Sequence, residues 1–527
     1  MRPIALPLGA LAAALALAGC AEPEPEDTGL VALDARGQLI RVKTDLLGVH
    51  PSEVELQAIE EEPELYGAFV DRYLEDPRFL PRLMDIYDAR LLMRNGSVGA
   101  EEPLRLIEHI YVNDLPFTEL VQADYTLAND ASALRFSIDV PDEPGWRAGW
   151  YEDARPHMGI LTMSSVWDRY PSMGQNANRH RANAVSRMLL CDDYLDRPIA
   201  FSRNAVDQVT VDPETAIRMS PDCNSCHSTL DPLAAHFFGF FGYDEDFGDP
   251  LLYRPENEEL WRDYANQGPG YYGQPTSTLE DLGDAIAQDP RFVDCAVRTV
   301  WEGLSQRDLQ DADWTEIQDH RSAFVSSGLL LRSLVRSVVL RPEYRAAHVE
   351  DPARIDTIAT VRVVSPAQLA SVMEGLTGYR WTFDGRDGLT DPSLGLVTLA
   401  GGIDGDSVTT ASRAPSVSLM LVHERLAQSA AWHVAENDLA VDREGDARLL
   451  GAVTRDDRPE GAGEQLFADQ IRHLFLQVTG RPLPEDATEP AELIELWSQI
   501  YSVDASPVAA WAGVVSVVLR DPAVLTY

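Results

Sequence analysis

The pentapeptide Cys223-Asn224-Ser225-Cys226-His227 is the most distinctive stretch of this 527-residue chain, and we expect the surrounding structure to be built around it. Its pattern, C-x-x-C-H, places two thiols about one helical turn apart and an imidazole directly after the second. This spacing is typical of covalent attachment of a c-type haem. Each cysteine would form a thioether with a haem vinyl group, and His227 would be the proximal iron ligand. The sequence therefore predicts haem c on Cys223 and Cys226.

Two other chemistries use a C-x-x-C pair. A thioredoxin-like pair follows a strand of a βαβ unit, but no alternating strand and helix pattern surrounds residues 223–227. A zinc site needs four ligands, usually as two close pairs, and Cys191 and Cys295 could supply the second two from distant positions. In an exported protein Cys191 and Cys295 could instead form a disulfide with each other. A structural metal or disulfide at the motif therefore stays as an alternative.

The sixth iron ligand is open in the sequence. No methionine occurs between His227 and Met373, so the downstream methionine ligand of small cytochromes is not expected. An iron without a second protein ligand is one possibility, and the upstream candidates are Met173, which we favour, followed by Met163, His157 and His180. A methionine would raise the reduction potential and favour electron transfer, whereas an open position would permit small-ligand chemistry.

Other groups near the motif have expected roles. Arg179 and Arg181 could neutralise the haem propionates, or they could belong to a solvent-exposed helix face. The backbone carbonyl of Pro232 could accept a hydrogen bond from the second ring nitrogen of His227. His236 is expected to lie in a loop near the haem edge or the propionates.

Apolar residues recur at helical spacing along most of the chain. Tyr66, Phe69, Val70 and Tyr73 are one such set, Ser52 to Glu55 has the spacing of a capping box, and Ser365-Pro366 has that of a helix start. We therefore predict a mainly α, multi-domain protein with a loop-rich haem region. The predicted parts are a signal peptide at 1–20, a disordered acidic tether at 21–38, an N-terminal helical domain at 39–150, a haem domain at 151–350 and a C-terminal helical domain at 351–527.

The N-terminal segment has the features of an export signal. Arg2 precedes an apolar run from Ile4 to Ala18 that is too short to span a membrane. The run ends in Leu17-Ala18-Gly19-Cys20, which resembles the lipobox of bacterial lipoproteins. That resemblance implies cleavage before Cys20 and lipidation of its thiol. Ala21 follows rather than Asp, which implies an outer-membrane lipoprotein facing the periplasm or the cell surface.

The composition excludes one class of partner and favours another. The chain has 43 Lys and Arg against 85 Asp and Glu, a formal net charge of −42. Such acidity repels nucleic-acid phosphates and favours docking of a cationic redox partner by electrostatic steering. It could also serve solubility alone.

Several segments in a shared order resemble the planctomycete-type cytochrome c family over residues from about 40 to 345. They are Asp124–Asp130, Gly159–Thr162, the basic segment Arg179–Cys191, the haem motif with its extension to Leu233, and Phe292–Cys295 followed by Val300-Trp301. The resemblance implies an exported haem protein that transfers electrons.

The expected function is therefore that of a membrane-anchored mono-haem c-type cytochrome in the cell envelope. One alternative is a haem enzyme, peroxidase-like or a dehydrogenase component, with an open iron site. The other is a structural or binding lipoprotein whose motif holds a metal or a disulfide.

Overall fold

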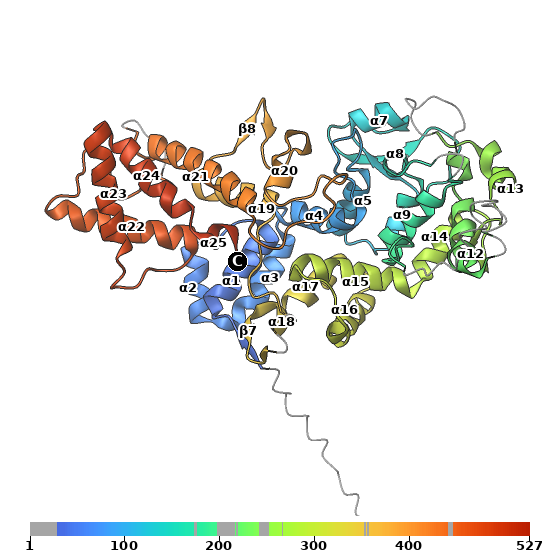
Figure 1. Ribbon diagram of the computed structural model, residues 1–527, viewed down its shortest axis with the longest axis horizontal. Coiled ribbons are helices and arrows are strands. Elements are labelled where there is room, and N and C mark those ends of the chain that lie inside the picture. The colour runs from blue at the N-terminus through green and yellow to red at the C-terminus, as the bar shows by residue number, and fades with distance from the viewer. Residues whose placement is uncertain are drawn as a thin grey trace, which may run out of the picture.

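The computed structural model describes residues 29–172, 176–197, 217, 220–241, 252–265, 267–352, 355, 358–440 and 446–527. The fold is mainly helical, as predicted, and its strands are short. The chain is elongated, with the helix that carries residues 223–227 at one end and the C-terminal helices at the other (Figure 1). None of the described helices combines the length and apolar character needed to cross a membrane.

The first part of the chain contains helices around a small antiparallel sheet. Its elements are β1 (Leu30–Ala32), α1 (Ala35–Leu47), α2 (Glu53–Glu61), α3 (Tyr66–Glu75), α4 (Phe79–Leu91), α5 (Glu102–Val112), α6 (Glu119–Gln122), β2 (Thr126–Ala128), α7 (Asp130–Phe136), β3 (Ile138–Asp139) and β4 (Arg147–Tyr151). The strand order of the sheet is β2-β4-β3.

The central part carries the haem motif. Its elements are the 3-10 helix η2 (Gly159–Thr162), α8 (Ser164–Arg169), α9 (Arg179–Leu190), α12 (Pro221–Ala235), α13 (Trp261–Tyr264), β5 (Gly270–Tyr271), β6 (Gln274–Pro275), α14 (Leu279–Gln288), α15 (Pro290–Ser305), α16 (Trp314–Ser326), α17 (Leu331–Val339), α18 (Pro342–Arg345) and β7 (Ala346–Val349). The sequence explains α15, for example: Asp289 caps its N-terminus, Pro290 occupies its first turn, and its apolar stripe is buried.

The last part is a bundle of longer helices. Its elements are α19 (Pro366–Thr377), β8 (Thr382–Phe383), β9 (Arg386–Asp387), α20 (Leu396–Leu399), α21 (Val417–Asp438), α22 (Ala462–Thr479), α23 (Glu489–Asp504), α24 (Pro507–Leu519) and α25 (Pro522–Leu525). Ser365 caps α19 in a capping box with Gln368, at the predicted helix start.

Two large hydrophobic cores divide the described chain. The first contains buried residues from Leu39 to Tyr344, and the second contains buried residues from Val363 to Leu525. The predicted start of the C-terminal domain at 351 lies between them. The predicted separation of residues 39–150 from 151–350 has no counterpart, because α15 packs against both α4 and α9 and joins the two ranges in one core.

The predicted disordered tether ends earlier than expected. Instead of extending to residue 38, the chain forms β1, which pairs antiparallel with β7 through Leu30 and Val349. α1 then begins at Ala35 because the side chain of Asp34 accepts a hydrogen bond from the backbone N–H of Gly37. Local capping and a distant strand partner therefore order residues that composition alone assigns to the tether.

A buried polar network connects the two cores. The fully buried carboxylate of Asp45 in α1 accepts hydrogen bonds from Arg82 Nε at 3.0 Å, Tyr344 Oη at 2.9 Å and Tyr527 Oη at 2.9 Å. Tyr527 is the last residue of the chain and packs against the second core. Three donors, one of them the buried cation Arg82, thus compensate the charge of Asp45 at the junction.

Candidate functional site

The haem motif lies on a helix, as its spacing predicts. Pro221 occupies the first turn of α12, and residues 223–227 follow directly. Cys223 is buried, Cys226 is partly exposed, and both are free thiols. The two sulfurs and the imidazole therefore come from adjacent turns of one rigid element.

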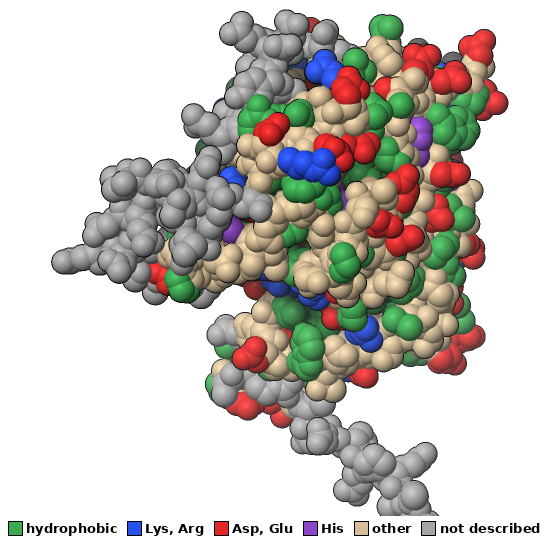
Figure 2. Space-filling model, turned by 90° about the vertical axis from the view of Figure 1, so that its right-hand side faces the viewer, with side chains coloured by type: hydrophobic (Ala, Val, Ile, Leu, Met, Phe, Trp, Pro, Cys, Tyr) green, Lys and Arg blue, Asp and Glu red, His purple; other side chains and the backbone are tan. Residues whose placement is uncertain are grey.

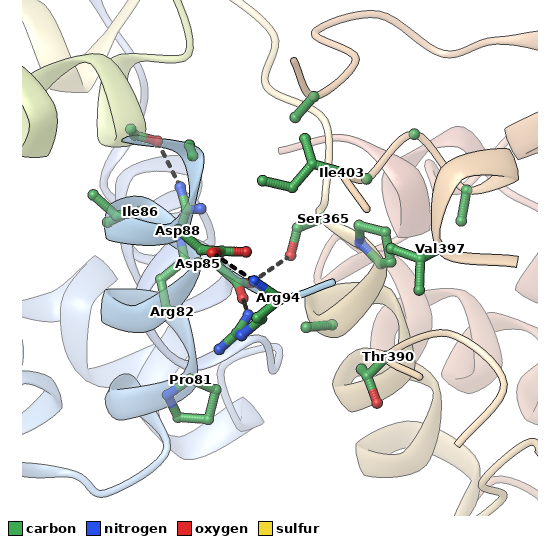
Figure 3. A pocket seen from close by; sticks show the side chains of 18 of the residues that line it. Pro81, Arg82, Asp85, Ile86, Asp88, Arg94, Ser365, Thr390, Val397 and Ile403 are labelled. Atoms are coloured by element: carbon green, nitrogen blue, oxygen red, sulfur yellow. Dashed lines mark hydrogen bonds and ion pairs between the residues drawn. The ribbon is translucent and has the colours of Figure 1, made fainter. Parts of the chain in front are cut away.

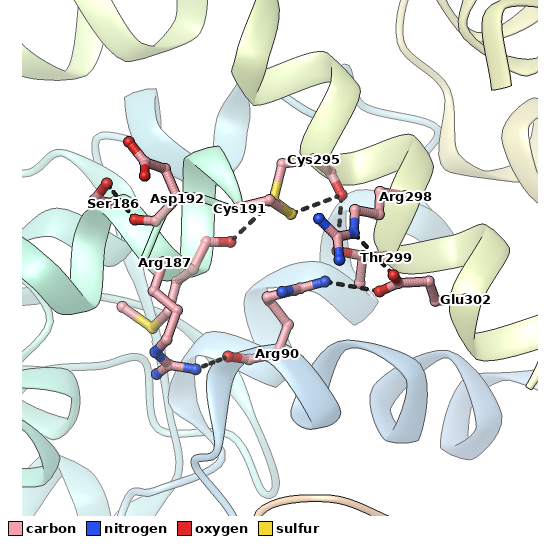
Figure 4. The surroundings of a disulfide bond; sticks show 10 residues. Arg90, Ser186, Arg187, Cys191, Asp192, Cys295, Arg298, Thr299 and Glu302 are labelled. Carbon is pink, nitrogen blue, oxygen red and sulfur yellow. Dashed lines mark hydrogen bonds and ion pairs between the residues drawn. A yellow bond between two sulfur atoms is a disulfide. The ribbon is translucent and has the colours of Figure 1, made fainter. Parts of the chain in front are cut away.

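The other two described cysteines form a disulfide. Cys191, at the end of α9, and Cys295, in α15, are joined at 2.11 Å (Figure 4). This bond excludes them from a four-cysteine zinc site with Cys223 and Cys226. It also fixes the C-terminal end of α9 to the main core. Cys20, the predicted lipidation site, lies outside the described residues.

The ring of His227 is held by a carboxylate. Its Nδ1 lies 2.8 Å from Oδ1 of Asp231, one turn further along α12. The same carboxylate accepts hydrogen bonds from Arg179 Nε at 2.7 Å and Nη2 at 3.2 Å. Burial alone would raise the pKa of Asp231, but the hydrogen bonds from His227 and Arg179 outweigh it and lower that pKa. An ionised carboxylate only accepts, so Asp231 favours the tautomer in which Nδ1 carries the proton and Nε2 presents a lone pair.

This arrangement corrects the expected partner of His227. The sequence-based candidate was the backbone carbonyl of Pro232, whereas the structure uses the side chain of Asp231. Residues four apart on a helix lie on the same face, and α12 continues past Pro232 to Ala235. The spacing H-x-x-x-D was visible in the sequence, but its meaning depends on that continuation.

Arg179 and Arg181, the predicted propionate contacts, both bind protein groups in the structure. Arg179 binds Asp231, and Arg181 is buried, with Nη1 donating to the backbone carbonyl of Phe240 at 3.0 Å. Burial lowers the pKa of Arg181 to about 9. Arg181 is therefore not part of a solvent-exposed helix face. Through Asp231 and Phe240 both arginines join α9 to α12 and the segment after it, and Arg181 also donates to Asn178 Oδ1 and to the carbonyl of Tyr170.

Three candidates for the sixth ligand, Met163, His157 and His180, lie among the described residues. Met163 is fully buried in the main core, where it fills space as core methionines do. His157 Nε2 accepts the backbone N–H of Tyr151 at 3.0 Å, and His180 Nδ1 lies 3.1 Å from the carbonyl oxygen of Pro171. Met173 lies outside the described residues. The identity of a second iron ligand therefore stays a prediction.

His236 has a different place from the one expected. It is buried at the end of α12, where Nδ1 lies 3.3 Å from the carbonyl oxygen of Leu233 and Nε2 lies 2.8 Å from Thr276 Oγ1. The neutral ring satisfies both contacts by donating from Nδ1 and accepting at Nε2. Burial lowers the pKa of His236 to about 4, so this histidine is a packed, neutral group.

A cavity of about 1130 Å³ lies between the two cores. Helix α4 forms one wall. Across from it lie Ser365, Thr390, Val397 and Ile403 (Figure 3). None of residues 223–227 lines this cavity. Within the described residues there is also no group of three or more His, Cys, Asp and Glu side chains suited to a metal ion. The motif and the cavity are therefore separate features.

The donor set on α12 fits a c-type haem. It consists of two free thiols, which thioether formation requires, and one imidazole whose tautomer is set by Asp231. Among the described residues, no hydrogen bond engages Nε2 of His227. No protein-family model, curated protein or solved structure matches this chain. The functional assignment therefore depends on the residues of this site.

Proposed function

We propose that this protein is a mono-haem c-type cytochrome of the planctomycete type that carries electrons in the cell envelope. The observation that supports this most is the geometry of α12, which presents Cys223, Cys226 and the Nε2 side of His227 on two adjacent turns. Cys223 and Cys226 would hold haem c, and His227 would ligate its iron. The haem, when bound, supplies one-electron chemistry. The protein fixes its position and the orientation of the ligand.

The location in the cell belongs to the same proposal. The lipobox at residues 17–20 would attach a lipid to Cys20 and anchor the chain as an outer-membrane lipoprotein. The disulfide between Cys191 and Cys295 agrees with an oxidising compartment outside the cytoplasm. Haem attachment in bacteria takes place in the same compartment.

The surface supports a cationic redox partner. Asp and Glu side chains predominate over Lys and Arg on the described surface at the α12–α14 end of the molecule (Figure 2). Opposite charge on a partner would increase the rate of encounter, and added salt would screen this attraction. We infer that the partner is a basic electron-transfer protein and not a nucleic acid.

The proposal is tested by producing the chain together with a haem-attachment system. A pyridine haemochrome assay should show one c-type haem in the wild type and in the Cys191→Ala/Cys295→Ala variant. It should show none in Cys223→Ala/Cys226→Ala. Both double variants remove two cysteines, so they are matched controls for each other. Equal haem content in both double variants would overturn the proposed attachment site.

The spectrum of the loaded protein separates electron transfer from the haem-enzyme alternative. A low-spin iron with two axial ligands would support the cytochrome. A high-spin iron that binds cyanide or peroxide rapidly would favour a haem enzyme with an open position. A protein without covalent haem would leave the structural lipoprotein.

A further inference from the structure

We propose that Asp231 is a positioning residue that fixes the tautomer of His227 and lowers the reduction potential of the haem iron. This inference depends on the proposed function, because it concerns the residue behind the iron ligand. The contacts that link His227 to Asp231 and Asp231 to Arg179 support it. The sequence alone predicts no such role for Asp231.

The carboxylate of Asp231 is buried, and its two partners are partly exposed. The side chain of Asp231 is 1% exposed, that of Arg179 is 18% exposed, and that of His227 is 22% exposed. Oδ1 of Asp231 lies 2.8 Å from His227 Nδ1 and 2.7 Å from Arg179 Nε. Charge-assisted hydrogen bonds of this length are stronger than neutral ones. Low solvent exposure prevents water from competing for the carboxylate.

The direction of the effect follows from the chemistry of the acceptor. A carboxylate draws the Nδ1 proton of an imidazole more strongly than a backbone carbonyl does, and this raises the basicity of Nε2. A more basic axial ligand, with a negative charge behind it, stabilises ferric iron more than ferrous iron. The equilibrium constant for reduction therefore falls.

Several contacts keep this geometry in place. The bidentate contact with Arg179 orients the carboxylate plane. α9, which carries Arg179, is held by Arg181 at the carbonyl of Phe240 and by the disulfide at Cys191. If Asp231 served only as the ion-pair partner of Arg179, it would not also need to contact His227. The additional bond to His227 makes Asp231 a link between the fold and the ligand.

The test compares the reduction potentials of haem-loaded variants. Asp231→Asn keeps a hydrogen-bond acceptor but removes the charge, so the equilibrium constant for reduction should rise at least tenfold, which is about 59 mV for a one-electron couple. Asp231→Glu keeps the charge and should stay closer to the wild type than Asp231→Asn does. Asp486→Asn removes an exposed charge in the C-terminal bundle and should leave the potential unchanged.

The possible results distinguish the inference from the proposed function. If the wild type acquires no haem, the proposed function fails. If Asp231→Asn acquires haem and keeps the wild-type potential, only the role of Asp231 is overturned. If Asp231→Asn cannot be recovered, resonance Raman spectra of the ferrous wild type after photolysis of bound carbon monoxide decide. The iron–histidine stretch should have the higher frequency of carboxylate-bonded histidines, and the lower frequency of carbonyl-bonded histidines would contradict the inference.

Discussion

We assign iron binding to His227 because one of its ring nitrogens is bound by protein and no hydrogen bond among the described residues engages the other. Asp231 holds Nδ1 at 2.8 Å, which leaves Nε2 as the ligating atom. His236, nine positions later, has both ring nitrogens in contact with protein oxygens. At the scale of single residues, hydrogen bonding separates a candidate ligand from a packed histidine.

Replacement of His227 by alanine should remove the iron ligand but leave both thioethers. We expect haem to stay covalently attached, while the absorption spectrum loses the features of the wild-type axial ligation. His473→Ala, which removes an exposed histidine of α22, should leave the spectrum unchanged. An unaltered spectrum in the His227 variant would contradict the assigned ligand.

His236 should make stability depend on pH. Burial lowers its pKa from the ordinary 6.5 to about 4, so the unfolded chain binds more protons than the folded protein between these values. The stabilisation is complete above pH 6.5 and is lost as the pH falls toward 4, by about 3 kcal/mol. His236→Gln should remove this part of the pH dependence of the unfolding free energy. Identical pH profiles for variant and wild type would refute it.

At the scale of elements, α9 connects the motif helix to the core. Arg179 and Arg181 reach α12 and the segment after it, and Cys191 bonds to α15 beside Arg90, Arg298 and Glu302 (Figure 4). The helix is therefore attached at both ends. Helix α9 therefore connects the site on α12 to the main core.

Removal of the disulfide should weaken this attachment. The bond joins residues separated by 104 positions, so Cys191→Ala/Cys295→Ala should lower the free energy of unfolding by about 2–5 kcal/mol. Denaturant unfolding of the variant should match that of the reduced wild type. A variant that unfolds at the same denaturant concentration as the oxidised wild type would contradict this role.

The sequence predicted individual helices better than their partners. The capping box at Ser52 and the start of α19 at Ser365 were visible because capping depends on residues a few positions apart. The helical placement of Cys223 and Cys226 was visible for the same reason. The contacts of Arg179 with Asp231 and of Arg181 with Phe240 were not, because these partners lie more than fifty positions away. Local spacing therefore identified the motif, and tertiary packing determined which groups support it.

At the scale of the whole molecule, two cores are joined through Asp45 and its donors. The carboxylate contacts Arg82, Tyr344 and Tyr527 and so brings together the beginning, middle and end of the chain. The cavity of about 1130 Å³ lies along the same junction. Helix α19 also packs against α1 and α4, so the Asp45 network is one of several contacts that place the cores.

Asp45→Ala should therefore be strongly destabilising. It leaves the buried Arg82 without its carboxylate, which typically costs about 3–5 kcal/mol. We expect denaturant unfolding to show an earlier transition in which the two cores separate. Asp486→Asn is the matched control for loss of one acidic charge. If Asp45→Ala unfolds like this control, the network does not join the cores.

The central claim is that α12 carries one covalent haem. The most direct measurement is the intact mass of the chain under denaturing conditions, after production with a haem-attachment system. We expect a single species heavier than the chain by one haem, and no added haem in Cys223→Ala/Cys226→Ala. A wild-type chain whose intact mass shows no added haem would contradict this attachment.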